Sequence, residues 1–363
     1  DNLGPKSKEK YEMFQKILKK IDECQKNRKI EMENRADYYL EVVRKTKKRI
    51  GPKNNLKFKD PDNGNMYSWF LKELRKIDLN RKNNIVPSIE EMKKIETIAY
   101  IFNEYYNFDS YYEMTYKYTQ NADLAYINFE TLCIGEEYEL SGYPTFNGPT
   151  EILSSVNKAG FDWWSLSSNH SMDRGVEGLL KQIELVRENY PDVITTGSHT
   201  SKKDKNRTLV KEINGIKVGF LGYTYGLNGF VLPEDKPWLV DLIDKDQMKK
   251  DMEALSKVSD IQLVSMHWGD EYQTYPNDEQ QDLANYLNEL GAEVVIGSHP
   301  HVIQPAKIIK GKKQDTLVYY SLGNYTSAQD AAPRMVGGMA SFTVNYDPNT
   351  FKTSFTDVKF IPT

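Results

Sequence analysis

Polar side chains that can bind a metal ion or transfer a proton follow directly after short apolar runs in the second part of the sequence. They are Glu130, Asn169, His170, His267, His299, His301 and Asn324. Four of the five histidines belong to this group, whereas His199 lies in a loop-like stretch and is interpreted as an ordinary surface residue. Imidazole, amide and carboxylate groups together suit divalent ions such as zinc, manganese or iron.

These residue types can support metal-dependent hydrolysis. A divalent ion lowers the pKa of water to about 7 in favourable zinc sites. Glu130 can bridge two ions and Asn169 can supply a neutral oxygen ligand, while His170 can donate a proton to the leaving group. In the His299-Pro300-His301 segment an extended backbone would send both imidazoles to the same side, where they could serve one site.

Each of these residues also has a simpler interpretation. A single glutamate after a strand is usually a surface or capping residue, and an asparagine there is usually a turn former. A histidine such as His267 is often a core residue with a satisfied hydrogen bond, and His-x-His alone is a weak motif. Asp173 is expected to act beside His170, but it can instead cap the helix expected from residue 176. Only the joint pattern and its order therefore favour a metal site.

The apolar runs are expected to be strands of a layered α/β domain, because helical patterns fall between them. The predicted strands cover residues 124–129, 161–166, 216–223, 262–266, 293–296 and 317–322. The predicted helices cover residues 150–159, 176–189, 246–257 and 278–290. Residues 340–360 alternate in the way of antiparallel strands. Ligands of open α/β sheets bind at the carboxyl ends of the strands, which is where the polar side chains lie.

Residues 1–106 have a different pattern and are predicted to form a separate helical region, followed by the α/β domain at 107–363. Residues 1–108 carry 25 Lys+Arg and 17 Asp+Glu, a net charge of +8, whereas the remaining residues carry 23 and 35, a net charge of −12. The lysines alternate with glutamates along helices, so they indicate a solvated surface, and nucleic acid is not an expected partner. The two cysteines form no metal-like pair, and no apolar run approaches the roughly 20 residues that span a bilayer.

The combined motifs resemble the bacterial capsule-synthesis protein CapA family, whose members are similar to calcineurin-like metallophosphoesterases. The resemblance covers about residues 107–360. It rests on Asn128-Phe129-Glu130, Ser168-Asn169-His170-Ser171-Met172-Asp173, His267-Trp268-Gly269-Asp270-Glu271-Tyr272, Gly297-Ser298-His299-Pro300-His301 and Ser321-Leu322-Gly323-Asn324-Tyr325.

The resemblance implies a four-layer α/β/β/α sandwich with one or two divalent ions. The implied metal ligands are Glu130, Asn169, His267, His299 and His301. The implied catalytic acid is His170, with Asp173 beside it, and Glu271 and Asn324 are expected to contact the substrate. The implied partners are an anionic polymer such as poly-γ-glutamate, or a phosphoester, and membrane subunits of a capsule synthase. The implied location is the outer face of the bacterial membrane, with the anchor outside this chain.

One departure from the family pattern concerns a first metal ligand. The family opens its domain with a strand that ends in Gly-Asp, and here the only Gly-Asp is Gly269-Asp270. Residues 97–101 can be a degenerate first strand that places Asn103 or Glu104 near the missing position. Two functions therefore stay open: a metal-dependent hydrolase, or a polymer-binding or assembly subunit with a degenerate metal site.

Overall fold

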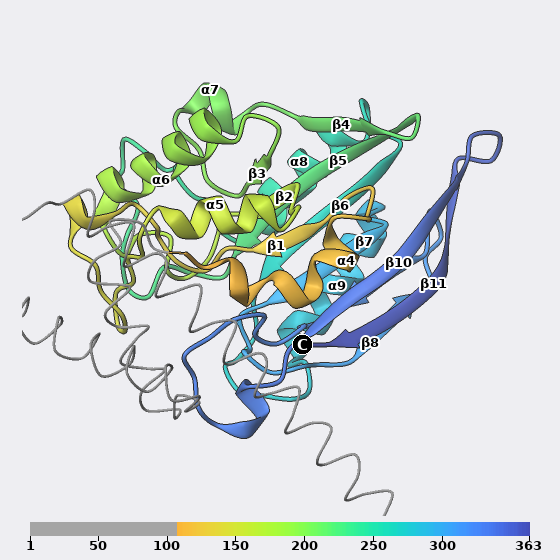
Figure 1. Cartoon of the computed structure of the whole chain (residues 1–363). Helices are drawn as coiled ribbons and strands as arrows, with labels where there is room; N and C mark the ends of the chain where they lie inside the picture. The colour runs from red at the N-terminus through yellow and green to blue at the C-terminus, as the bar shows by residue number, and fades with distance from the viewer. Residues whose placement is uncertain (1–106) are drawn as a thin grey trace, which may run out of the picture. The chain divides into compact units, whose positions relative to one another are not determined.

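A computed structural model of the chain describes residues 107–363 (Figure 1). The expectations for residues 1–106, including a strand at 97–101 and a substitute ligand at Asn103 or Glu104, lie outside the described residues. The described part opens with three short helices, η1 (Asp109–Tyr111), η2 (Glu113–Thr115) and α4 (Tyr116–Thr119). Within residues 107–363, no helix is long and apolar enough to cross a membrane.

The first sheet is small and parallel, with the strand order β1-β2-β3. Side chains alternate across it: Trp163 points to one face and the neighbouring Trp164 packs in the cluster on the other face. That second cluster includes Leu153 and Leu179 from the two helices that cover the sheet. The elements are β1 (Tyr126–Asn128), β2 (Trp163–Ser165), β3 (Ile194–Thr196), α5 (Glu151–Lys158) and α6 (Gly175–Asn189).

The second sheet has six strands in the order β4-β5-β6-β7-β9-β8. The four central strands are parallel and the two outer strands are antiparallel to their neighbours. Every residue of β6 is buried, as expected of a strand covered on both faces. The strands are β4 (Leu209–Ile213), β5 (Ile216–Thr224), β6 (Ile261–His267), β7 (Val294–Ser298), β8 (Ala306–Ile309) and β9 (Thr316–Tyr319).

Two helices cover the outer face of this sheet, α8 (Lys245–Leu255) and α9 (Asp278–Leu290). Their buried side chains pack with Val264 of β6, whereas the neighbouring Leu263 packs toward the other sheet. The two sheets therefore share an inner core and each carries helices on its outer face (Figure 1). The predicted four-layer α/β/β/α sandwich is confirmed.

Local sequence signals explain where these helices begin and end. Asn277 and Gln280 form a capping box at the start of α9, and Gly291 ends the helix with a left-handed φ of 103°. The Asp244 side chain accepts a hydrogen bond from the Gln247 N–H at the start of α8. These caps satisfy backbone groups that the helices leave unpaired.

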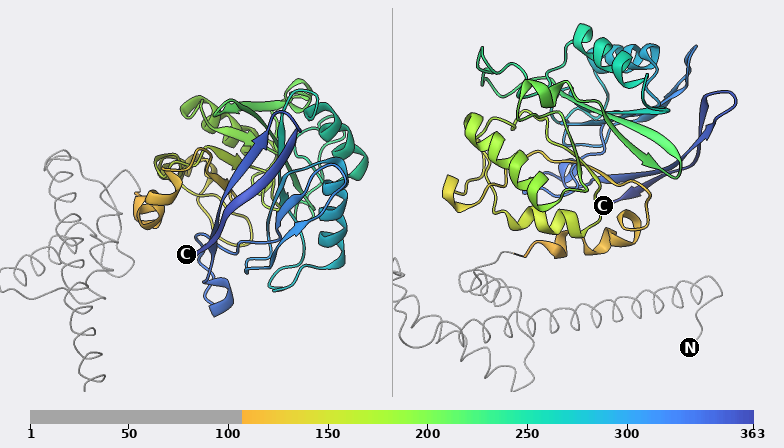
Figure 2. Two further views of the ribbon diagram at one scale, coloured as in Figure 1. Left: turned by 90° about the vertical axis from the view of Figure 1, so that its right-hand side faces the viewer. Right: turned by 90° about the horizontal axis from the view of Figure 1, so that it is seen from above.

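The remaining elements lie at the edges of the sandwich. A two-stranded antiparallel hairpin lies between the half that contains α5 and α6 and the half that contains α8 and α9 (Figure 2). It confirms the antiparallel strands predicted at residues 340–360. The elements are the strands β10 (Gly338–Asp347) and β11 (Lys352–Pro362), and the short helices η3 (Glu136–Tyr138), α7 (Lys202–Lys205) and η4 (Ala332–Arg334).

A buried carboxyl beside β7 makes the stability of the fold depend on pH. Glu293 is 2% exposed, and its Oε2 accepts a hydrogen bond from the Gln262 N–H at 2.6 Å. Burial raises the pKa of Glu293 to about 8, although this hydrogen bond opposes the shift. The folded state therefore holds this proton between the ordinary pKa of about 4.5 and about 8, and stability falls as pH rises through that range.

The Glu293→Gln variant keeps a hydrogen-bond acceptor and cannot ionise. Because one pKa unit corresponds to about 1.4 kcal/mol, we expect the native chain to lose a few kcal/mol more than this variant between pH 5 and pH 9. Urea unfolding at several pH values measures the difference. The exposed Glu289→Gln in α9 is the matched control and should leave the pH slope unchanged. Equal slopes in the native chain and Glu293→Gln would contradict the prediction.

Candidate metal centre

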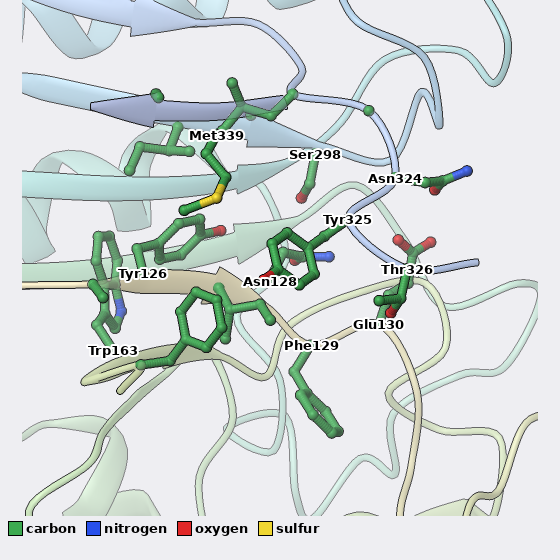
Figure 3. A pocket seen from close by; sticks show the side chains of 18 of the residues that line it. Tyr126, Asn128, Phe129, Glu130, Trp163, Ser298, Asn324, Tyr325, Thr326 and Met339 are labelled. Carbon is green, nitrogen blue, oxygen red and sulfur yellow. The ribbon is translucent and has the colours of Figure 1, made fainter. Parts of the chain in front are cut away.

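The parallel strands bring the predicted polar side chains to one end of the sandwich. Glu130 lies two residues beyond β1, and Asn169 and His170 lie in the loop after β2. His267 is the last residue of β6 and is fully buried, and His299 directly follows β7. One cavity of ≈ 1750 Å³ is lined by Glu130, Asn169, His170, His299, His301 and Asn324. In Figure 3, Glu130 and Asn324 lie at one end of this cavity, and Tyr126, Trp163 and Met339 lie at the other.

Glu130 is at the centre of the polar group. Its Oε1 is 3.4 Å from the Nε2 of His267 and 3.6 Å from the Nε2 of His301. Glu130, His299 and His301 each offer one atom such that these atoms all lie within 4.8 Å of one another. Asn169 joins the group because its Oδ1 is 2.8 Å from the Nε2 of His267. The structure therefore brings all five predicted ligands together.

The electrostatics of the group suit a cation. Burial alone would raise the pKa of Glu130, but the neighbouring imidazoles lower it to about 2, so the group is a carboxylate at neutral pH. Burial lowers the pKa of His299 to about 3, and the neighbouring His267 adds to this effect. His299 is therefore a neutral imidazole, which is the form that binds metal ions.

The His299-Pro300-His301 segment reaches the site in a conformation that the sequence did not predict. Both histidines have left-handed backbones, with φ of 97° at His299 and 58° at His301. Non-glycine residues rarely adopt this region, and such strain clusters at functional sites. The rings lie 6.0 Å apart between centroids. The prediction that they share a site agrees with the structure, but the extended backbone assumed for it is wrong.

Neighbouring polar side chains fix the orientation of two imidazoles. The Oγ of Ser298 is 3.1 Å from the Nδ1 of His267, and the Oδ1 of Asn324 is 2.8 Å from the Nδ1 of His301. In both rings the Nε2 is thereby left to face Glu130. Such contacts hold metal-binding histidines in one tautomer. Asn324, which is predicted to contact the substrate, lines the cavity and is hydrogen-bonded to a candidate ligand.

His170 lies beside the ligand group and has its own carboxylate partner. Its Nδ1 is 2.8 Å from the Oδ2 of Asp173, and its ring contacts Phe146 edge-on at 4.5 Å between centroids. The Nδ2 of Asn228 is 3.5 Å from the ring nitrogens, and Asn228 also accepts a hydrogen bond from Asn169 at 3.1 Å. Asn228 therefore links His170 to the candidate ligands.

The alternative role for Asp173 as a helix cap is wrong. Helix α6 begins after Arg174, and no side-chain cap hydrogen bond is present there. The Oδ2 of Asp173 instead accepts a hydrogen bond from the Phe146 N–H at 2.6 Å and contacts His170. The carboxylate therefore orients the imidazole.

The donor set fits a divalent ion. The Oε1 of Glu130 and the Nδ1 of His299 are buried and have no hydrogen-bond partner among the described residues. Buried polar atoms without a partner are unfavourable in a folded protein, and a bound cation would satisfy both. A carboxylate oxygen, an amide oxygen and imidazole nitrogens are ligands that zinc, manganese and iron accept.

His199 was interpreted as a surface residue, and this interpretation is wrong. It is 7% exposed, and its Nε2 is 2.8 Å from the Oδ2 of Asp241. The Nζ of Lys205 is 2.8 Å from the Oδ1 of the same carboxylate. The burial arises because residues 197–199 lie against residues 239–241 through backbone hydrogen bonds, contacts that are distant in sequence.

Two site residues were not predicted. Asn228 precedes a glycine and has a φ of 49°, so the Asn-Gly pair was a detectable turn signal. Ser298 completes the Gly-Ser-His segment and supports His267. Glu271, which was predicted to contact the substrate, is exposed and lines the cavity.

The cavity also separates two strand edges. β1 pairs only with β2, and β10 pairs only with β11, within residues 107–363. Residues of both strands line the cavity, and Met339 of β10 lies across from Tyr126 of β1 (Figure 3). The CapA family pattern begins with a strand that ends in Gly-Asp. Within residues 107–363, no strand precedes β1 and none takes that place.

Comparison with known proteins agrees with the motifs. The family described as "Bacterial capsule synthesis protein PGA_cap" matches residues 75–329. "PGA biosynthesis protein CapA" of Bacillus subtilis (strain 168) is 32% identical over 181 residues, which cover 49% of this chain and 45% of that protein. "Capsule biosynthesis protein CapA" of Bacillus anthracis is 27% identical over 232 residues, or 62% and 55% of the two chains. The chain thus spans about half the length of these relatives.

Solved structures that resemble the fold of this chain share little sequence identity with it. A Staphylococcus aureus structure provisionally assigned as a 5'-nucleotidase has a TM-score of 0.48 and 15% identity, over 70% of this chain and 48% of that one. A 5'-nucleotidase precursor from Thermus thermophilus has a TM-score of 0.39 and 16% identity, over 58% and 40% of the two chains.

Proposed function

Because the chain belongs to the bacterial capsule synthesis protein family PGA_cap, we propose that it acts in capsule synthesis as a metal-dependent hydrolase. The bond it cleaves is a phosphoester or an amide-type bond of an anionic polymer such as poly-γ-glutamate. The convergence of Glu130, His299 and His301 within 4.8 Å, with His170 beside them, is the observation that carries this proposal. In this proposal the protein acts on the outer face of the bacterial membrane, beside the membrane subunits of a capsule synthase.

Glu130, Asn169, His267, His299 and His301 would hold one or two divalent ions. An ion bound there supplies a Lewis acid that polarises the substrate and lowers the pKa of water. The chain supplies the remaining functions.

His170 donates a proton to the leaving group, and Asp173 stabilises the charged imidazole and fixes its orientation. Asn228 holds the His170 ring against the ligand group. Glu271 contacts the substrate at the rim, and Asn324 positions His301. The aromatic ring of Phe146 packs edge-on against His170 and helps to hold the imidazole in place.

A second candidate function is a polymer-binding or assembly subunit. One observation favours it: within the described residues the group that can bind a metal contains a single carboxylate, Glu130. The Gly-Asp of the family pattern would add a second one. A site with fewer anionic ligands binds divalent ions more weakly. Under this second candidate function, we expect the chain to bind the polymer without hydrolysing it.

Elemental analysis of the full chain purified without chelators tests the proposal. We expect one or two manganese, zinc or iron ions per chain and metal-dependent hydrolysis of bis(4-nitrophenyl) phosphate. The His267→Ala variant should lose both, and its circular dichroism spectrum and melting curve establish whether it folds. A native chain that takes up no metal, even from excess manganese or zinc, would contradict the hydrolase and favour the second candidate.

A further inference from the structure

An arginine lies one aromatic ring away from the candidate metal ligands. The guanidinium of Arg334, in η4, lies over the ring of Tyr272 at 3.6 Å from its centroid. Tyr272 in turn stacks with the imidazole of His301, at 6.0 Å between centroids and 26° between planes. A guanidinium this close to an aromatic face is attracted by the partial negative charge on that face. Arg334 is therefore held at the rim of the site.

Hydrogen bonds reinforce this placement. The Nδ2 of Asn324 donates to the backbone carbonyl of Arg334 at 2.8 Å, while the Oδ1 of the same side chain contacts the Nδ1 of His301. The Tyr272 N–H donates to the carbonyl of Pro300 at 2.7 Å. The backbone of Arg334 and its aromatic platform are both tied to the segment that carries His299 and His301.

The donors of the guanidinium are free to bind a ligand. Stacking uses the flat face of the group and leaves its N–H bonds pointing outward in the plane. In residues 107–363, no carboxylate lies within ion-pair distance of Arg334, and no hydrogen bond from its side chain is present. Arg174 differs, since its guanidinium donates to the carbonyls of Tyr138, Asp173 and Glu139. A half-buried arginine with unused donors is suited to an oxyanion.

The acidic lining of the cavity gives the positive charge of Arg334 a role in binding an anionic substrate. Among the described residues that line the cavity, none is lysine or arginine, whereas Asp123, Glu130, Asp173 and Glu271 carry carboxylates. The cavity wall therefore offers an anionic substrate no lysine or arginine to compensate these carboxylates. Arg334, next to the lining residue Tyr272, is placed to supply the compensating charge.

We propose that Arg334 and Tyr272 form an anion-binding subsite at the rim of the candidate metal centre. The subsite binds a carboxylate or phosphate group that neighbours the bond to be cleaved, and thereby selects substrates with a second negative charge. The inference rests on the proposed function for its place in a reaction. The binding of an anion by the subsite is a separate property and needs no turnover.

Calorimetric titration of the full chain with inorganic phosphate and with glutarate tests the subsite directly. The titrations are made on chelator-treated protein, so that bound metal does not contribute. We expect Arg334→Gln to weaken binding of at least one anion by roughly 10-fold or more, because a charged hydrogen-bonding partner is lost. The matched control is Arg207→Gln, which removes the same charge from an exposed arginine outside the cavity lining.

The Tyr272 ring, on which the Arg334 guanidinium lies, provides a second pair of variants. Tyr272→Phe keeps the ring and should retain anion binding, whereas Tyr272→Leu removes it and should weaken binding about as much as Arg334→Gln. A purely structural role for Arg334 would leave the anion affinity of all folded variants equal. Equal affinity in the native chain, Arg334→Gln and Tyr272→Leu therefore overturns the proposal.

The two anions distinguish the sources of the negative charge. Tighter Arg334-dependent binding of glutarate indicates a carboxylate polymer, and tighter binding of phosphate indicates a phosphoester. If the metal-loaded chain shows turnover, Arg334→Gln should raise KM for substrates with a second charge and leave kcat nearly unchanged. An absence of turnover with Arg334-dependent anion binding would reject the hydrolase and retain the subsite.

Discussion

Replacing His170 with alanine is expected to lower kcat for esters with a poor leaving group by at least roughly 100-fold, within the range that a positioned general acid contributes. The imidazole is 8% exposed, and its Nδ1 is 2.8 Å from the Asp173 carboxylate. That contact occupies the Nδ1 and leaves the Nε2 as the ring nitrogen that can donate to a leaving group. The variant should keep its metal content, because His170 is not in the group that includes Glu130, His299 and His301.

Comparing substrates with good and poor leaving groups distinguishes proton donation by His170 from its other possible roles. A 4-nitrophenolate departs readily without a proton, so the loss in His170→Ala should be small for 4-nitrophenyl esters and large for methyl or phenyl esters. Asp173→Asn keeps the shape of the side chain and should show a smaller loss with the same dependence on the leaving group. An equal loss for good and poor leaving groups, or a loss of bound metal, would assign His170 a different role.

The layers of the fold could be predicted because the buried strands are nearly continuous apolar runs. The predicted strand at 262–266 is β6 (Ile261–His267), and the one at 216–223 is β5 (Ile216–Thr224). Both are central strands that are covered on two sides, so their burial appears directly in their composition. The strands β3, β4 and β8 were missed. β3 has three residues, and β4 and β8 lie at sheet edges, where exposed polar residues such as Glu212 and Lys307 interrupt the short apolar runs.

The site could be located from sequence because parallel strands end at a common edge. The residue type and the position shortly after a predicted strand are sufficient to predict Glu130, Asn169 and His267 as metal ligands. The supporting contacts could not be predicted in the same way. Ser298 and Asn228 are ordinary turn or loop residues in the sequence, and only the fold brings them to His267 and His170.

Long-range pairing explains the wrong interpretation of His199. Its own neighbours are polar and resemble a surface loop, but its partner Asp241 is 42 positions away. A buried histidine next to a carboxylate and Lys205 has no local signature. The same reason applies to Arg334 and Tyr272, whose contact joins the loop after β6 to η4.

Glu130 should determine whether the site binds metal at all. Its Oε1 lies between His267 and His301, and within the described residues it is the one carboxylate of the group that can hold an ion. Glu130→Gln has nearly the same shape but lacks the negative charge. We expect it to weaken manganese or zinc binding by more than the roughly 10- to 100-fold typical of residues that only support a ligand.

Two readouts measure this effect on chelator-treated protein. Calorimetry gives the affinity directly, and the melting temperature gives it through linkage, since a ligand at 100 times its Kd stabilises the fold by about 2.7 kcal/mol. The native chain should therefore melt at a higher temperature with metal, and Glu130→Gln should not. Glu271→Gln is the matched control, because Glu271 lines the same cavity but lies outside the ligand group. If Glu130→Gln binds metal as tightly as the native chain does, the ion is held elsewhere, and the candidate metal centre is not the site that binds it.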